Sequence, residues 1–197
     1  TGGAALAGTT ALATGTYYAS SVNANGCESA RTAAGMTVSA TTLAGANQNS
    51  TLSVTGTTNF PGCANLIIKL SPNGASPVSG STTAKVWIEG TQASNFVKRH
   101  YEITPALNTA TATGRITLYF KQTEFDDFNT VSAVDLPTSS ADATGIANLL
   151  IEKRSGVSTD GSGLPSSYTG SVITIDPVDA DIVWNVTANR WEVSFDV

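Results

Sequence analysis

The sequence predicts an all-β protein built as an antiparallel β-sandwich. Apolar side chains recur at every second position in many short runs, which is the pattern of strands that bury one face. Turn signals such as Asn25-Gly26 and Asp160-Gly161 separate these runs at short intervals. Short strands joined by tight turns favour hairpins, whereas a parallel sheet needs long crossover connections.

The strands are placed by their alternation. The clearest one ends the chain, where Trp191, Val193 and Phe195 alternate with Glu192 and Ser194. Similar patterns predict strands within 52–57, 66–70, 85–89, 96–103, 115–120, 147–153, 171–175 and 182–186. Two stretches, 122–129 and 142–147, have the character of helical turns instead. We expect the core scaffold to comprise Trp191, Val193, Phe195, Ile116, Leu118, Phe120, Val97, Tyr101 and Ile103.

The composition indicates an extracellular sheet protein. Of the 197 residues, 41% are hydrophobic, which is enough for a core, but only 13% are charged, against about 25% in an average soluble domain. The net charge of −5 and the absence of any basic cluster longer than Lys98–Arg99 argue against a nucleic-acid partner. No apolar run approaches the ~20 residues that cross a bilayer, so we expect no membrane insertion.

A change of composition divides the chain into residues 1–39 and 40–197. The first part supplies only two or three strands, and an isolated hairpin is marginally stable in water. It must therefore dock on the second part, or be completed by residues or chains outside this sequence. Exposed strand edges without charged gatekeepers can pair with another chain, which predicts a homo-oligomer or a filament.

Both parts resemble modules of large surface proteins of Bacteroidota. Gly15-Thr16-Tyr17-Tyr18 and Asn25-Gly26-Cys27-Glu28-Ser29-Ala30-Arg31 are similar to the C-terminal half of an immunoglobulin-like repeat. The runs 97–105 (VKRHYEITP), 115–120 (RITLYF) and 179–185 (DADIVWN) are similar to the β-rich module that often comes after such repeats. The resemblance implies an immunoglobulin-like or jelly-roll-like sandwich behind an incomplete immunoglobulin-like segment.

The same resemblance implies a location rather than an activity. Such regions usually stand upstream of a C-terminal sorting domain for type IX secretion, which delivers proteins to the outer surface of Gram-negative bacteria. We therefore expect an extracellular, cell-surface chain. Because its first residues show no leader pattern, we also expect a mature piece of a longer protein.

Cys27 and Cys63 are the only cysteines. A disulfide between them is compatible with an oxidising compartment, but two cysteines do not make a framework. A lone buried thiol at either position, or a partner for Cys27 upstream of this sequence, remains an alternative. The resemblance implies the upstream partner, because the missing half of the repeat would hold a cysteine facing Cys27.

The sequence favours a protein without catalytic activity. His100 is the only histidine, so a Ser–His–Asp or Cys–His apparatus would depend on it alone. It lies in a strand pattern, and no Gly-x-Ser-x-Gly turn supplies a nucleophile. We interpret His100 as a structural residue and expect no cofactor other than a structural calcium ion.

The candidate calcium ligands are Asp176, Asp179 and Asp181, because calcium binds several hard oxygens from one loop. Asp160 is a second candidate in another loop. The simpler interpretation is that these carboxylates accept hydrogen bonds from nearby backbone amides in turns. Both interpretations are compatible with the residues.

Trp87 and Tyr119 are candidate platforms for a sugar, whose apolar face stacks on an exposed ring. Trp87 alternates with Val86 and Ile88, so it points outward if these two residues point into the core. The alternative for Trp87 is burial at the junction with the first part of the chain.

These observations predict a non-catalytic structural or adhesive module of a secreted, cell-surface multidomain protein. Its partners would be other protein chains or surface glycans. The alternative is a carbohydrate-binding module attached to a secreted polysaccharide-degrading enzyme. Exposed rings in a row across one sheet face would favour this alternative.

Overall fold

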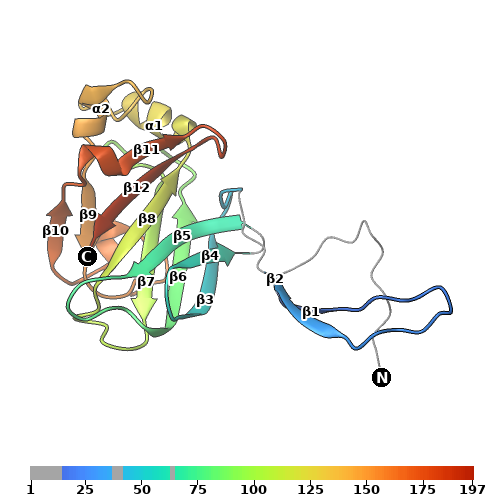
Figure 1. Cartoon of the computed structure of the whole chain (residues 1–197). Coiled ribbons are helices and arrows are strands. Elements are labelled where there is room, and N and C mark those ends of the chain that lie inside the picture. The colour runs from blue at the N-terminus through green and yellow to red at the C-terminus, as the bar shows by residue number, and fades with distance from the viewer. Residues whose placement is uncertain (1–14, 37–41, 63–64) are drawn as a thin grey trace. The chain divides into compact units, whose positions relative to one another are not determined.

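The computed structural model describes residues 15–36, 42–62 and 65–197 (Figure 1). The chain divides into two compact units, Thr1–Ser39 and Ala40–Val197. The regular secondary structure of the described chain is mainly strands in antiparallel sheets, which confirms the prediction of an all-β sandwich.

The first unit contains an antiparallel pair of strands, β1 (Gly15–Ala19) and β2 (Thr32–Met36). The expected Asn25-Gly26 turn is present in their connection, where the Gly26 N–H donates to the Asn23 carbonyl at 2.9 Å. Gly26 has a φ of +80°, a conformation that glycine adopts without steric cost.

The second unit is a sandwich whose larger layer is a five-stranded sheet in the order β11-β12-β8-β5-β4. Its strands are β4 (Thr58–Gly62), β5 (Asn65–Pro72), β8 (Gly114–Phe120), β11 (Ile182–Asn185) and β12 (Arg190–Asp196). The strongest alternation of the sequence falls on the β8–β12 pair. Val193 lies opposite Leu118 there, and Phe195 lies opposite Ile116, so the apolar residues of both strands face the core together.

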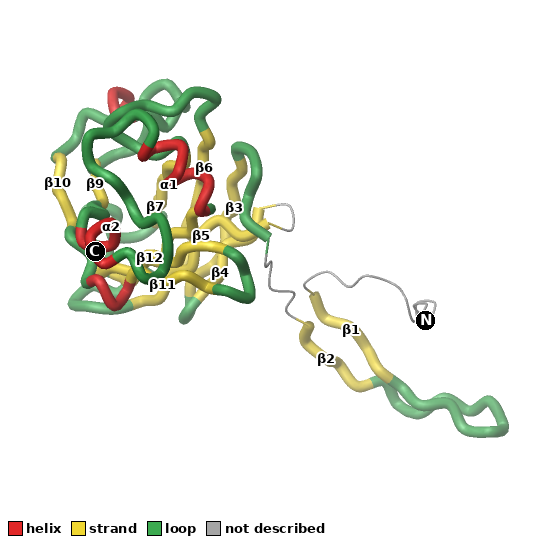
Figure 2. The backbone as a smooth tube through the Cα atoms, turned by 90° about the horizontal axis from the view of Figure 1, so that it is seen from above, coloured by secondary structure: helices red, strands yellow, loops and turns green. Residues whose placement is uncertain are grey.

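The opposite layer consists of two separate sheets. One is three-stranded, in the order β3-β6-β7, with β3 (Gln48–Val54), β6 (Gly80–Ile88) and β7 (Arg99–Pro105). The other is the pair β9 (Ile151–Arg154) and β10 (Val172–Ile175). Figure 2 shows β10, β9, β7, β6 and β3 succeeding one another across this layer. The order defines an interruption in the layer, because β9 and β7 do not pair.

Aromatic rings connect the core to the first helix. Phe125 of helix α1 (Gln122–Asn129) lies between Phe120 and Trp191, at ring-centroid distances of 5.4 and 5.9 Å. Trp191 is fully buried, and its indole N–H donates to the side-chain oxygen of Gln122 at 2.8 Å. All the expected scaffold residues belong to this core or pack against it.

A buried ion pair fixes α1 to β7. The Arg99 guanidinium lies 2.8 Å from Glu124, and it also donates to the Ala44 carbonyl at 2.8 Å. Glu124 in turn accepts from the backbone N–H of Lys121, one of the first N–H groups of the helix that lack an intrahelical partner. The Arg99–Glu124 pair therefore connects a strand, a helix start and the segment before β3.

The two helical turns expected at 122–129 and 142–147 are present as α1 and α2 (Ala143–Ala147). The strand expected over 147–153 is shorter, because Asp142 accepts from the Gly145 N–H and starts a helix that still includes Ala147. Strand β4 was not predicted from the alternation of apolar residues. Its Pro61 is tolerated because β4 is an edge strand whose register shifts between Phe60 and Pro61.

Two short 3-10 helices complete the second unit, η1 (Pro165–Ser167) and η2 (Asp179–Asp181). None of the helices in the described ranges is long and apolar enough to span a membrane.

Candidate binding groove

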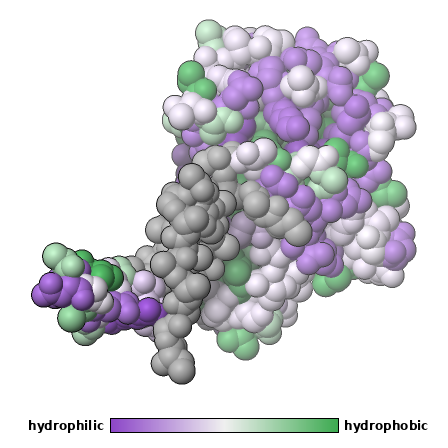
Figure 3. Space-filling model, turned by 90° about the vertical axis from the view of Figure 1, so that its right-hand side faces the viewer, coloured by the Kyte–Doolittle hydropathy of each residue, from purple (hydrophilic) through white to green (hydrophobic). Residues whose placement is uncertain are grey.

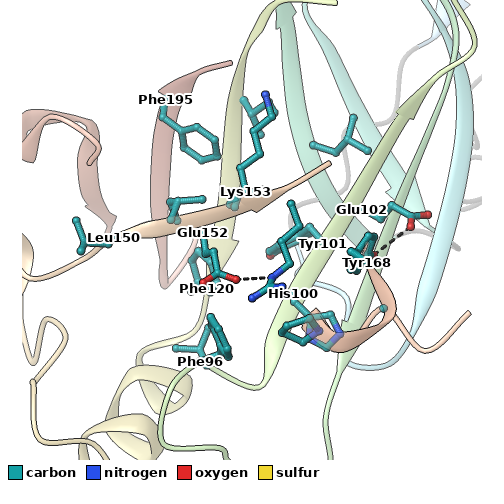
Figure 4. Close-up of a pocket in the computed structure, with 18 of the residues that line it drawn as sticks. Phe96, His100, Tyr101, Glu102, Phe120, Leu150, Glu152, Lys153, Tyr168 and Phe195 are labelled. Carbon is teal, nitrogen blue, oxygen red and sulfur yellow. Dashed lines mark hydrogen bonds and ion pairs between the residues drawn. The ribbon is translucent and has the colours of Figure 1, made fainter. Parts of the chain in front are cut away.

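A large recess of about 670 Å³ opens between the two layers of the second unit. Strand β7 borders it through Tyr101 and Ile103, and the segment 149–154 borders it through β9. Its floor consists of core side chains of the five-stranded sheet, including Phe120 and Phe195. We call this recess the β7–β9 groove, and Figure 4 shows it in close-up.

Tyr101 ties the two layers together at the floor of the groove. Its ring meets Phe120 edge-on with centroids 5.9 Å apart, and Figure 4 shows both side chains beneath the strand that carries Glu152 and Lys153. The Tyr101 hydroxyl donates to the backbone carbonyl of Tyr119 on β8. Burial raises the pKa of this hydroxyl well above its ordinary value, so it remains a hydrogen-bond donor at physiological pH.

The connection between β9 and β10, residues 155–171, covers part of the outer face of the three-stranded sheet, and we call it the strap. Glu102 of β7 holds it, because its carboxylate accepts from the Ser158 backbone N–H at 2.8 Å and from the Tyr168 hydroxyl at 3.0 Å. Lys85 lies 2.6 Å from the same carboxylate. Burial raises the pKa of Glu102, but these three interactions outweigh it and the net pKa is lowered. The carboxylate therefore stays charged near neutral pH.

The strap reaches the sheet at Gly163, which lies against the indole of Trp87. A Cβ on Gly163 would be 2.5 Å from the Trp87 ring, and the glycine has a φ of +69°. Trp87 also stacks on His100, with ring centroids 5.7 Å apart and the planes 14° from parallel. The contact therefore requires a residue without a side chain.

His100 is partly buried between Trp87 and Glu89. Its Nε2 lies 3.5 Å from the Glu89 carboxylate and makes no hydrogen bond. Burial lowers the pKa of the imidazole, and the Glu89 charge raises it by less, so the net pKa is below the ordinary value. The neutral ring is the form that packs against Trp87 at pH 7.

Neither of the two candidate rings is an exposed platform. As expected, Trp87 lies on the sheet face away from the core, whereas Val86 faces the core. The strap covers Trp87, however, and only 8% of its surface is exposed. Tyr119 is 2% exposed, packs with Leu43 and Leu66, and lies 4.4 Å beneath the Arg190 guanidinium. The expectation of a sugar platform at these rings is wrong, because neighbouring chain segments already occupy both faces.

The candidate calcium ligands do not converge either. The described residues contain no group of three or more His, Cys, Asp or Glu that could hold a metal ion. Asp181 instead lies 2.6 Å from Arg115, which also approaches Asp196. Asp160 accepts from the Ser162 backbone N–H at 2.8 Å, as expected of an aspartate in a turn. The calcium hypothesis at Asp176, Asp179 and Asp181 is therefore wrong for this loop.

The two cysteines fall in different parts of the chain. Cys27 is exposed in the first unit, and Cys63 lies outside the described residues. Their pairing stays a prediction.

Several exposed apolar side chains line the groove. Four large ones that line it are 37 to 54% exposed: Phe96, Val134, Leu150 and Leu164. On the face of the second unit seen in Figure 3, by contrast, hydrophobic residues lie singly among hydrophilic and neutral ones. A recess with an apolar floor and exposed apolar groups in its lining is typical of an interaction site.

From the sequence, Val97, Tyr101 and Ile103 were expected in the core scaffold, but they were not identified as part of a groove. The missing information was which edge of β7 is unpaired, and strand order is not encoded in the alternation of a single strand. The exposed Phe96, just before this strand, was the one local signal.

The fold and the groove define an antiparallel β-sandwich with one interrupted layer. No family model, curated protein or solved structure matches this chain.

Proposed function

We propose that this chain is a non-catalytic structural and adhesive module of a secreted, cell-surface multidomain protein, and that it binds partner polypeptides at the β7–β9 groove. The observation that carries this proposal is an apolar groove bordered by two strands to which no described residue pairs on the groove side. Unpaired strand edges bind other chains through backbone hydrogen bonds. Homo-oligomers or filaments are one form that such binding takes.

The surface location is supported by composition. Charged residues are 13% of the chain, and hydroxyl pairs such as Thr51–Thr83 and Thr117–Ser194 join neighbouring strands at 2.8 and 2.9 Å. The resemblance to surface proteins of Bacteroidota points the same way, toward delivery to the outer surface of a Gram-negative bacterium by type IX secretion.

The alternative is a carbohydrate-binding module. Its best remaining rings are Tyr18 in the first unit, 66% exposed, and Phe96 at the groove, 37% exposed. A sugar site usually combines rings with converging polar groups, and the exposed Thr91, Ser94 and Asn95 line the groove with Phe96, so the ring at the groove is the candidate that this alternative retains.

Two measurements on the full chain separate these functions. We expect light scattering from 1 to 100 μM to show a mass that rises with concentration, and a glycan array to retain nothing. Retention of a defined polysaccharide, together with a monomeric mass at every concentration, would overturn the proposal in favour of the carbohydrate-binding module. A Phe96→Ser variant would then test the ring directly.

A further inference from the structure

The free edge of β7 can be assigned residue by residue. The Glu89 N–H donates to the Lys98 carbonyl and the Ala106 N–H donates to the Ser81 carbonyl, so even-numbered residues of β7 bond to β6. In an antiparallel ladder the intervening residues direct their N–H and C=O groups to the other side. Arg99, Tyr101 and Ile103 therefore present backbone groups to the groove, and no other hydrogen bond in the described part of the chain uses them.

The facing edge of β9 is assigned by the same reasoning. The Ser155 N–H donates to the Ser171 carbonyl at 3.0 Å, so odd-numbered residues of β9 bond to β10. Glu152 and Arg154 therefore direct their backbone groups away from β10, toward the side where Figure 2 shows β7. The gap in the layer is thus bordered on both sides by unpaired backbone donors and acceptors.

The side chains around the gap define the chemistry of an occupant. The floor is apolar, so side chains that point inward from the gap must be apolar too. The groove is lined by three carboxylates and three basic groups: Glu89, Glu102, Glu152, Lys98, Lys153 and Arg154. Balanced charge gives no preference for a charged partner.

We propose that the β7–β9 groove takes an extended, uncharged segment of a partner polypeptide, with apolar side chains at every second position. This proposal rests on the proposed function and names its partner. The segment pairs with β7 on one side and β9 on the other, and joins β3-β6-β7 to β9-β10 as one continuous six-stranded layer. Its inward side chains contact Phe120 and Phe195, and Leu164 and Tyr168 of the strap lie beside it.

A peptide strand fits these observations better than an acyl chain or a sugar. An acyl chain would satisfy the apolar floor but would leave the backbone groups of Tyr101 and Ile103 without partners. A sugar could bond to these groups, but its hydroxyls would lie against the apolar floor. Only an extended backbone offers donors and acceptors at the strand repeat together with apolar side chains between them.

The direct test uses the full chain and synthetic peptides seven residues long, the length of β7. The probe alternates Val and Thr, the first control holds the same residues in two blocks, and the second control is N-methylated at every second amide. Binding is measured by fluorescence polarisation of a labelled peptide. We expect the alternating peptide to bind at least about tenfold more tightly than either control, because the controls lose the apolar register or the backbone bonds.

Two variants locate the binding in the groove. Ile103→Lys places a charge on the groove face of β7 and is expected to weaken peptide binding at least about tenfold. Thr104→Lys, on the opposite face of the same strand, is the matched control and is expected to bind as the unaltered chain does. The melting temperatures of both variants are first compared with that of the unaltered chain, to show that they are folded. The comparison between the alternating and the N-methylated peptide uses the unaltered chain. It therefore tests backbone pairing in the groove even if Ile103→Lys fails to fold.

Equal binding of the alternating and block peptides overturns this inference, as does displacement of the alternating peptide by palmitate at equal concentration. A chain that self-associates but binds no alternating peptide also overturns it, while the proposed function survives. A chain that neither self-associates nor binds any peptide overturns both.

Discussion

The buried ion pair between Arg99 and Glu124 gives the sharpest test of how β7 is held. Replacing Glu124 with Gln keeps the size of the side chain but removes its charge. Arg99 is 2% exposed, so its guanidinium would remain charged in the interior without a counter-charge. Breaking a buried pair by removing one partner costs about 3–5 kcal/mol.

For a chain of this length each kcal/mol lowers the melting temperature by about 2–4 °C. We therefore expect Glu124→Gln to melt about 6–20 °C below the unaltered chain. The assays are thermal and urea unfolding, both monitored by tryptophan fluorescence, since Trp191 packs 5.9 Å from Phe125 on the same helix as Glu124. An unchanged slope of free energy against urea shows that the variant still unfolds in one step.

The matched control is Glu152→Gln, which removes the partner of Arg154 in a pair whose side chains are both 28% exposed. Partly exposed pairs contribute about 0–1 kcal/mol, so this variant should melt within a few degrees of the unaltered chain. A loss below about 1 kcal/mol in Glu124→Gln would refute the reasoning, because a charge cannot be left unpaired in the core at so small a cost.

Three further predictions concern the strap and the loops. Gly163→Ala should destabilise the chain by about 1–3 kcal/mol more than Gly161→Ala in urea unfolding. Both glycines have a positive φ, but only a Cβ at position 163 would lie against Trp87. Equal losses of stability in the two variants would contradict a steric cause. The pKa of His100 is lowered in the folded state, so its contribution to stability is present above pH 6.5 and is lost as the pH falls through the folded pKa. The unaltered chain should therefore lose more stability than His100→Gln between pH 7 and 5. Parallel profiles of stability against pH for the two proteins would contradict this. The melting temperature should be the same in EDTA and in calcium chloride, since Asp181 is already paired with Arg115; a rise in calcium would restore the calcium hypothesis.

The alternation of apolar residues was sufficient to predict the layers of the second unit. A strand with one buried face must place its apolar residues two apart, and Trp191, Val193 and Phe195 obey this rule in the structure. Local signals also located α1, because Phe125 and Phe128 are three residues apart and both are buried. Strand alternation and helical spacing depend only on residues that are close together in the sequence, so they can be predicted from the sequence alone.

The edges and coverings of the sheets were decided by the tertiary structure alone. The position of Trp87 in the alternation places it on the outer face of the sheet. Whether it is exposed to solvent depends on the strap, which is distant in sequence and can contact Trp87 because Gly163 has no side chain. The same holds for Asp181, whose partner Arg115 lies on another strand. The groove is a further case, because the edge of a strand is free or paired according to the order of strands in the sheet. The alternation along one strand determines which residues face inward, and it carries no information about the neighbour that the strand will have.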